Sequence, residues 1–284
     1  MIFVNSMSDL FHESVPDGWI MQVLAIMARC PQHRFQILTK RSKRMRKFMT
    51  KWADLDGEDF EPKLVNGPEE TRKAHPSGRG QLFADMLESM GPVPKGAAYP
   101  AFDWLGGMIN WPDALSNVWL GVSCEDQTRA DERVPDLLKT PAAIRFVSAE
   151  PLLGPINFAG GGRLADGRQR GGYYWLTERP CPVCKTADKL LKPREAFSHP
   201  INCGWRMDNA PAHDKWNRRG IDWIIVGGES GKNFRPMQME WAHRIHDDCK
   251  RAGTKFFFKQ DCGPKSGKQG RASNELWNCK EFPQ

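Results

Sequence analysis

The stretch WIIVGGESG, residues 223–231, joins four consecutive apolar residues to two glycines and a polar tail. Five other short apolar runs also end in polar residues, and they begin at Ile2, Phe35, Val118, Ile144 and Lys255. Most of these runs are separated by helix-like stretches. Continuous apolar strands that alternate with helices are typical of a parallel sheet covered by helices. The sequence therefore predicts an α/β fold with parallel strands, in the form of a partial or complete (β/α) TIM-like barrel.

The composition predicts a soluble, cytoplasmic protein. The chain of 284 residues is long enough for a full α/β core with insertions. No run approaches the roughly 18 apolar residues of a membrane span, and acidic residues interrupt the first thirty positions, so neither a membrane segment nor a signal peptide is expected. The formal charge of +7 favours acidic partners such as nucleic acid or phosphorylated substrates. The identity of any protein partner stays open.

Two segments interrupt the alternation of strands and helices. Residues 54–117 are acidic and polar, with glycine, proline and serine, and residues 160–220 are rich in glycine, cysteine and aromatic side chains. Loops of this length within a compact domain indicate insertions. We therefore expect one barrel domain over residues 1–284 that carries two insertions.

The second insertion has the spacing of a metal site. Cys181 and Cys184 form a knuckle in which two thiolates bind one ion, and Cys203 supplies a third thiol. A structural zinc ion takes four ligands in tetrahedral geometry. His199 lies four residues before Cys203 and is the expected fourth ligand, with His213 in reserve. The pattern predicts a structural Cys3His zinc site; unpaired thiols and a redox pair are the alternatives.

Replacement of Cys181 by serine should release this zinc. We expect elemental analysis to give about one zinc ion per chain before the change and none after it, because structural zinc sites lose affinity when a thiolate is removed. The barrel should stay folded while residues 160–220 loosen. A zinc content that the substitution leaves unchanged would exclude Cys181 as a ligand.

Polar residues follow every predicted strand. In parallel α/β folds, ligands bind beyond the carboxyl ends of the strands. The candidate ligand-binding residues are Asn5, Ser6, Asp9, Thr39, Lys40, Ser123, Glu125, Ser148, Glu150, Gly227, Gly228, Glu229, Ser230, Lys259 and Gln260. The two glycines allow a ligand close to the backbone, and Glu229 can accept a hydrogen bond from an amine or a ribose hydroxyl. Internal ion pairs are the alternative, with Lys40 or Lys259 bound to Glu150.

Basic and aromatic residues favour a nucleic-acid partner without establishing one. The stretch RSKRMRKFMTKW from Arg41 predicts an amphipathic helix whose basic face is either solvated or in contact with phosphates. The second insertion adds tryptophan, lysine and arginine side chains near its end. One function consistent with these features is a zinc-containing nucleic-acid-binding protein without catalysis. No motif identifies catalytic residues.

Several of the strand-end motifs are shared with a known family. They are FVNSMSDLFHESVP, FQILTKR, NVWLGVSCEDQ, RFVSAEPLLGPI, DWIIVGGESG, RPMQMEW and FFFKQDCG. Together they resemble a phage-associated family of unknown function, the gp thirty-seven / gp sixty-eight phage proteins, whose members look like radical-SAM barrels. The resemblance implies a barrel enzyme of the radical-SAM type, with a three-cysteine loop that holds a [4Fe-4S] cluster and S-adenosylmethionine.

The chain departs from this family pattern at its cysteines. It contains no CxxxCxxC-like triplet, and it begins inside what would be the second strand of the barrel, at Met1 and Ile2. Two interpretations follow: the chain is an N-terminally incomplete version, or it is a relative that has lost radical chemistry. We expect the incomplete version, because a barrel strand at residue 2 without a neighbour leaves an open sheet edge.

Overall fold

Six parallel strands form the sheet in the computed structural model, which describes residues 1–53, 115–159, 175–176 and 220–283. The strands are β1 (Ile2–Val4), β2 (Phe35–Thr39), β3 (Val118–Ser123), β4 (Ile144–Ala149), β5 (Trp223–Gly227) and β6 (Lys255–Gln260). Each strand coincides with one of the six apolar runs. The predicted α/β fold with parallel strands is therefore confirmed.

The order of the strands corrects one part of the prediction. The strands follow one another as β1-β2-β3-β4-β5-β6, the sequential order of a (β/α) barrel. A barrel closes only when its first and last strands pair. In the described residues β1 and β6 are the two ends of this order. The expectation of a complete barrel is therefore wrong, and the described sheet is open.

The described chain divides into two compact units. Unit 1 contains residues 1–123 and 132–148, and unit 2 contains residues 124–131 and 149–284. Helix α5 (Gln127–Leu138) contributes residues to both. The helices of unit 1 are α1 (Asp17–Ala28) and α2 (Ser42–Ala53), and those of unit 2 are α6 (Met239–Ala252) and α7 (Asn274–Asn278).

In unit 1, β2 lies between β1 and β3. Phe35 at the start of β2 pairs with Ile2 on one side and with Val118 on the other. Helix α1 buries Ile20 and Leu24, while Trp19 on the same helix is 64% exposed. All six residues of β3 are buried, which explains why this strand reads as a continuous apolar run.

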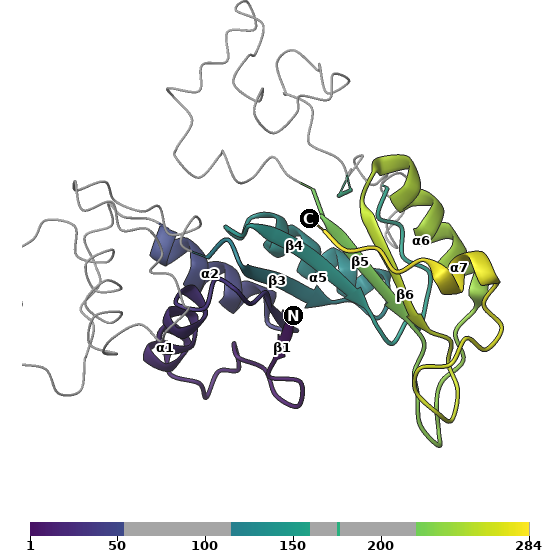
Figure 1. The fold of residues 1–284 in the computed structure, drawn as a ribbon, viewed down its shortest axis with the longest axis horizontal. Helices are drawn as coiled ribbons and strands as arrows, with labels where there is room; N and C mark the ends of the chain where they lie inside the picture. The colour runs from purple at the N-terminus through teal and green to yellow at the C-terminus, as the bar shows by residue number, and fades with distance from the viewer. Residues whose placement is uncertain (54–114, 160–174, 177–219, 284) are drawn as a thin grey trace, which may run out of the picture. The chain divides into compact units, whose positions relative to one another are not determined.

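In unit 2, α6 and α7 both pack along β6 (Figure 1). Phe256 of β6 makes an edge-to-face contact with His246 of α6, and Phe258 makes one with Trp277 of α7. Cys249 lies on the buried face of α6, together with Ala242 and Ile245. Helix α6 is followed by Gly253, whose φ of +73° is the left-handed conformation in which glycine commonly ends a helix.

The C-terminal segment covers the free edge of β6. Phe257 and Lys280 form an antiparallel bridge. The Phe258 N–H donates to the Cys279 carbonyl at 2.9 Å, and the Glu281 N–H donates to the Phe256 carbonyl at 3.0 Å. An uncovered strand edge would offer its backbone to other chains. This part of unit 2 therefore has its own protected edge.

The described parts of both predicted insertions are packed, and the rest of each insertion lies outside the described residues. The side chain of Asn117 in unit 1 donates hydrogen bonds to three carbonyls near the end of α1, at 2.9 to 3.1 Å. Trp175 and Leu176 in unit 2 are buried. The hydroxyl of Thr254 donates to the Leu176 carbonyl at 3.2 Å. Among the described helices, none is long and apolar enough to cross a membrane.

Candidate functional site

The candidate ligand-binding residues fall into two groups, one in each unit. In unit 1, Asp9, Thr39 and Lys40 meet where β1 and β2 end. In unit 2, Glu150 and Lys259 meet near Gly227 at the end of β5. Within each unit, polar residues from the ends of different strands therefore lie together. The ligand itself stays a prediction for all of these residues.

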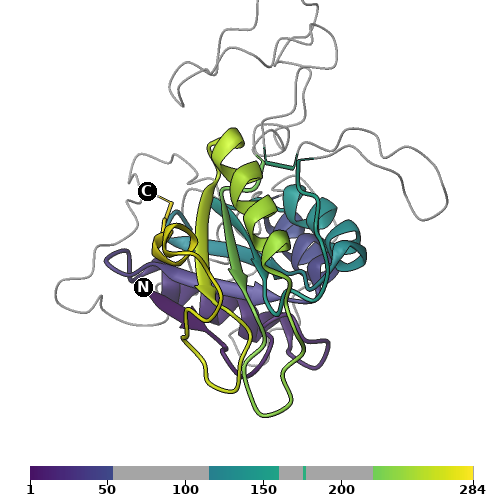
Figure 2. The ribbon, with the colours of Figure 1, turned by 90° about the vertical axis from the view of Figure 1, so that its right-hand side faces the viewer.

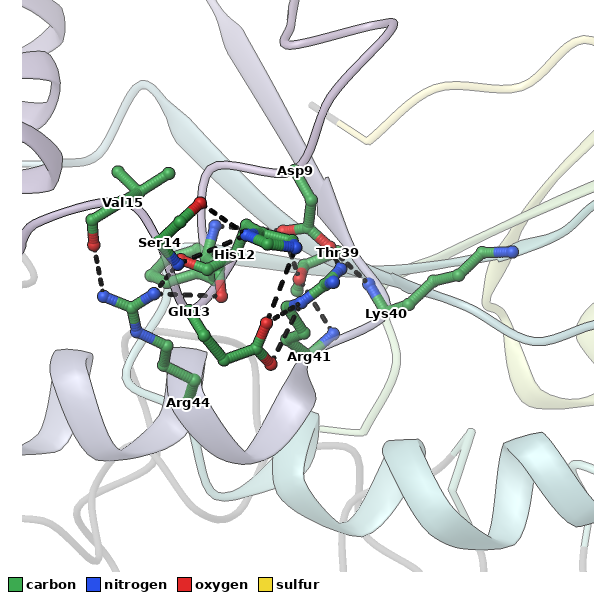
Figure 3. A network of polar contacts seen from close by, with 10 residues as sticks. Asp9, His12, Glu13, Ser14, Val15, Thr39, Lys40, Arg41 and Arg44 are labelled. Carbon is green, nitrogen blue, oxygen red and sulfur yellow. Dashed lines mark hydrogen bonds and ion pairs between the residues drawn. The ribbon is translucent and has the colours of Figure 1, made fainter.

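Asp9 lies at the centre of the network in unit 1 (Figure 3). Its Oδ1 accepts hydrogen bonds from the Phe11 N–H and the Thr39 hydroxyl at 2.9 and 2.7 Å. Its Oδ2 accepts from the Lys40 backbone N–H at 3.2 Å and from the Arg41 guanidinium at 2.9 Å. The bonds from Thr39, Lys40 and Arg41 tie the loop after β1 to the end of β2. Asp9 therefore fixes the loop, and its carboxylate already has partners within the protein.

The arginines of the basic segment 41–52 also bind groups of unit 1. Each forms an ion pair with a carboxylate: Arg41 with Glu13 at 3.0 Å, Arg44 with Asp17 at 3.0 Å and Arg46 with Asp136 at 3.1 Å. Arg44 also donates to the carbonyls of His12 and Val15 (Figure 3). The arginines of this segment therefore bind carboxylates and carbonyls of unit 1, and among the described side chains of α2 those of Lys43 and Lys47 are exposed cations.

The remaining candidates of unit 1 are not part of this network. Asn5 and Ser6 are exposed in the turn after β1, where Asn5 adopts a φ of +56°. Ser123 and Ser148 face each other in the register of β3 and β4, and each is 5% exposed. Their burial indicates a role in packing at the strand ends.

In unit 2, an ion pair joins the end of β6 to the residue that follows β4. The Lys259 ammonium lies 2.9 and 3.0 Å from the two carboxylate oxygens of Glu150. The register of β5 and β6 shifts at this point, since Val226 pairs with Phe258 while Gly227 pairs with Gln260. Lys259 is thus the extra residue of a bulge, and bulges often redirect a side chain beside a functional site. The alternative of an internal Lys259–Glu150 pair is present in the structure.

Protein atoms occupy the space that a side chain would need at Gly227 or Gly228. A Cβ on Gly227 would lie 3.2 Å from Cδ of Glu150, and a Cβ on Gly228 would lie 2.2 Å from the backbone nitrogen of Cys262. Gly227 therefore accommodates the Glu150 side chain, and Gly228 allows the backbones after β5 and β6 to approach each other closely.

Glu229 forms a second ion pair, with Arg235 six residues further along the chain. Its Oε2 accepts from the Arg235 backbone N–H at 2.7 Å and from Nε at 2.9 Å, while Oε1 accepts from Nη2 at 2.7 Å. These side-chain and backbone hydrogen bonds lower the pKa of Glu229 to about 2. Glu229 is thus a hydrogen-bond acceptor as predicted, but its donor in the structure is Arg235.

Asp261 and Arg271 form a third pair in the loop after β6. Asp261 is 2% exposed, and its carboxylate accepts from Arg271 Nε, Nη2 and the backbone N–H at 2.8 to 2.9 Å. Burial alone would raise the pKa of Asp261. The hydrogen bonds from Arg271 and from the Cys262 N–H outweigh burial and lower the pKa to about 2.

Other strand-end candidates of unit 2 stabilise the loops around these pairs. The Gln260 amide donates to the Gly228 carbonyl at 2.9 Å. Ser230 forms a bridge with Gly263 in the loop after β6. The Glu125 carbonyl accepts from the Leu153 N–H at 2.8 Å.

Sequence reasoning missed the two arginines, Arg235 and Arg271. Arg235 comes six residues after Glu229, and Arg271 comes ten residues after Asp261. A carboxylate just after a strand with an arginine up to ten residues later is therefore the sequence signal for these ion pairs.

The predicted metal ligands Cys181, Cys184, His199 and Cys203 lie outside the described residues, and so does His213. Within residues 1–53, 115–159, 175–176 and 220–283, no group of three or more His, Cys, Asp or Glu side chains has the arrangement of a metal site. A [4Fe-4S] cluster needs several thiolates close together. The described cysteines therefore do not fit such a cluster. The zinc site stays a prediction.

The structure is an α/β fold with polar pairs at the carboxyl ends of parallel strands in each unit. A family model described as "Protein of unknown function (DUF5131)" matches residues 1–279, and the chain belongs to this family. Comparisons with curated proteins and with solved structures gave no match. The description of this family states no activity. The phage association and the radical-SAM likeness therefore remain predictions from the sequence.

Proposed function

We propose that the protein is a phage-related, radical-SAM-like α/β protein that binds S-adenosylmethionine at the strand ends of unit 2. The resemblance of the strand-end motifs supports the class of protein. The sequential order of parallel strands supports a partial barrel of the same type. The proposed contact is between Glu150 and Lys259 and the amino-acid end of the ligand.

The observation that carries this proposal is the ion pair at the β6 bulge. Glu150 and Lys259 come from chain segments far apart in sequence, and their side chains are 21% and 49% exposed. An α-amino acid group carries an ammonium and a carboxylate. It can replace this pair by offering its ammonium to Glu150 and its carboxylate to Lys259. Opening a partly exposed pair costs little, because such pairs contribute only about 0–1 kcal/mol.

When bound, S-adenosylmethionine supplies an activated alkyl group on a sulfonium. The described residues supply charged partners for its amino-acid group. They do not supply the thiolates of a cluster, as shown above. The proposal therefore concerns recognition of the ligand and includes no radical step.

Isothermal titration of the full chain with S-adenosylmethionine tests the proposal. We expect Lys259→Gln and Glu150→Gln each to weaken binding at least tenfold, since a hydrogen bond to a charged group contributes about 1.5–3 kcal/mol. The matched control is Lys255→Gln, which removes the same charge from the opposite end of β6. This control should bind like the unmodified protein.

Three outcomes would overturn the proposal. The first is that the unmodified protein does not bind S-adenosylmethionine. The second is that the two site variants bind it as tightly as the Lys255→Gln control does. The third is that adenosine binds as tightly as S-adenosylmethionine. The last outcome would show that the amino-acid group is not recognised. Methionine serves as the complementary probe, and its binding should depend on Lys259 in the same way.

A further inference from the structure

The loops after β5 and β6, residues 228–238 and 261–273, lie side by side in unit 2 (Figure 2). We call them the paired loops. Gly231 N–H donates to the Gly263 carbonyl, and Gly263 N–H donates to the Glu229 carbonyl, both at 3.0 Å. Arg271 Nη2 adds a bond of 2.7 Å to the Met237 carbonyl. These bonds across the two loops hold them in one arrangement.

The loop after β6 has its own internal supports. The Gln260 side-chain oxygen accepts from the Ser266 hydroxyl at 2.9 Å and from the Gly267 N–H at 2.7 Å. Gly267 and Gly270 have φ values of +70° and +57°, in the left-handed region that glycine adopts without strain. The lysines on this loop are therefore presented by an ordered backbone, which reduces the entropy lost on binding a partner.

The paired loops carry an excess of positive charge. They contain five basic and two acidic residues. Both acids are bound by arginines of the same loops, Glu229 by Arg235 and Asp261 by Arg271. The other three basic residues, Lys232, Lys265 and Lys268, are exposed. Among the described residues no ion pair involves these lysines, so their charges are available to an anionic partner.

The first of the paired loops also carries an exposed aromatic residue. Phe234 is 36% exposed and stands between Lys232 and Arg235 in the first loop. Cationic side chains that follow a phosphate backbone, together with an aromatic ring on which a base stacks, are the combination found in proteins that bind single strands. A duplex keeps its bases stacked inside the helix, so the exposed ring favours an unpaired strand.

We propose that the paired loops bind single-stranded nucleic acid. Lys232, Lys265 and Lys268 contact the phosphates, and Phe234 stacks against a base. This inference goes beyond the binding of S-adenosylmethionine and does not depend on it, since it uses different residues. It also differs from the phosphate contact left open for α2, whose arginines are bound within unit 1.

Fluorescence anisotropy of a labelled oligothymidine of about 20 nucleotides tests this inference with the full chain. We expect Lys232→Gln/Lys265→Gln/Lys268→Gln to weaken binding at least tenfold at about 100 mM salt. The slope of log K against log salt should fall by about 2, because each phosphate contact on a single strand contributes about 0.7. Phe234→Ala should weaken binding about tenfold with little change in slope, because stacking releases no counterions.

The matched control is Lys139→Gln/Arg244→Gln/Lys250→Gln, which removes three exposed positive charges outside the paired loops. This control should retain the binding and the salt slope of the unmodified protein. Equal losses in both triple variants would show non-specific attraction and overturn the inference. So would absence of oligothymidine binding, equal affinity for a duplex of the same length, or binding to phosphatidylserine vesicles alone. Circular dichroism confirms that each variant is folded.

Discussion

Replacement of Gly228 by alanine is expected to lower the free energy of unfolding by about 3 kcal/mol, near the upper end of typical overpacking costs. The added Cβ would lie 2.2 Å from the nitrogen and 2.6 Å from the Cα of Cys262. These are backbone atoms, so no rotamer change relieves the overlap. Moving them would also stretch the two hydrogen bonds that join Gly228 to Gln260, each 2.9 Å long. Urea unfolding followed by circular dichroism measures the loss.

Gly263→Ala is the matched control for this prediction. Gly263 belongs to the same paired loops, but among the described residues no atom beyond its two chain neighbours lies within 4 Å of the position of its Cβ, and its φ is not in the left-handed region. The free energy of unfolding of this variant should differ from that of the unmodified protein by no more than about 0.5 kcal/mol, as for an ordinary surface position. Similar losses in the two variants would show that the cost reflects glycine flexibility and not the close approach of the two backbones.

The strands could be predicted from the sequence because burial leaves a local pattern. A strand that is buried on both faces needs apolar residues at successive positions, and β3 and β5 have them. Whether the sheet closes depends on a pairing between β1 and β6, which are far apart in the chain. No local pattern encodes that pairing, so the complete barrel was a wrong expectation while the strands themselves were found.

For the candidate site, the sequence likewise predicts which polar residues lie at the strand ends but not which of them pair. Polar residues at neighbouring strand ends meet because parallel strands end at one edge of the sheet, as Asp9 and Thr39 do. The partner of each charge depends on finer geometry. Lys259 reaches Glu150 because of a bulge, and Arg235 folds back onto Glu229 within a loop. Neither the bulge nor the loop conformation has a clear signature in the sequence.

Asp261→Asn is expected to lower the free energy of unfolding at pH 7 by about 2 kcal/mol. The pKa of Asp261 is about 2 in the folded protein against an ordinary value of 3.8. A carboxyl whose pKa is depressed by folding stabilises the protein above its ordinary pKa, and a shift of this size is linked to about 2 kcal/mol. The contribution is complete above about pH 4 and is lost as the pH falls toward 2. The unmodified protein and the variant should therefore differ most at neutral pH and converge in acid.

Two comparisons identify Arg271 as the source of this effect. Asp247→Asn removes an exposed carboxylate whose neighbour is His246, at 3.6 Å, and should change stability by less than about 0.5 kcal/mol at neutral pH. Arg271→Gln should reduce the acid dependence, because the guanidinium supplies the main hydrogen bonds that depress the pKa. In the double variant the two losses should not add, since both changes remove the same interaction. Additive losses would mean that Asp261 is stabilised by its backbone donors alone. The paired loops would then owe their order to the bonds between their backbones, and Arg271 would be a surface cation like the three lysines.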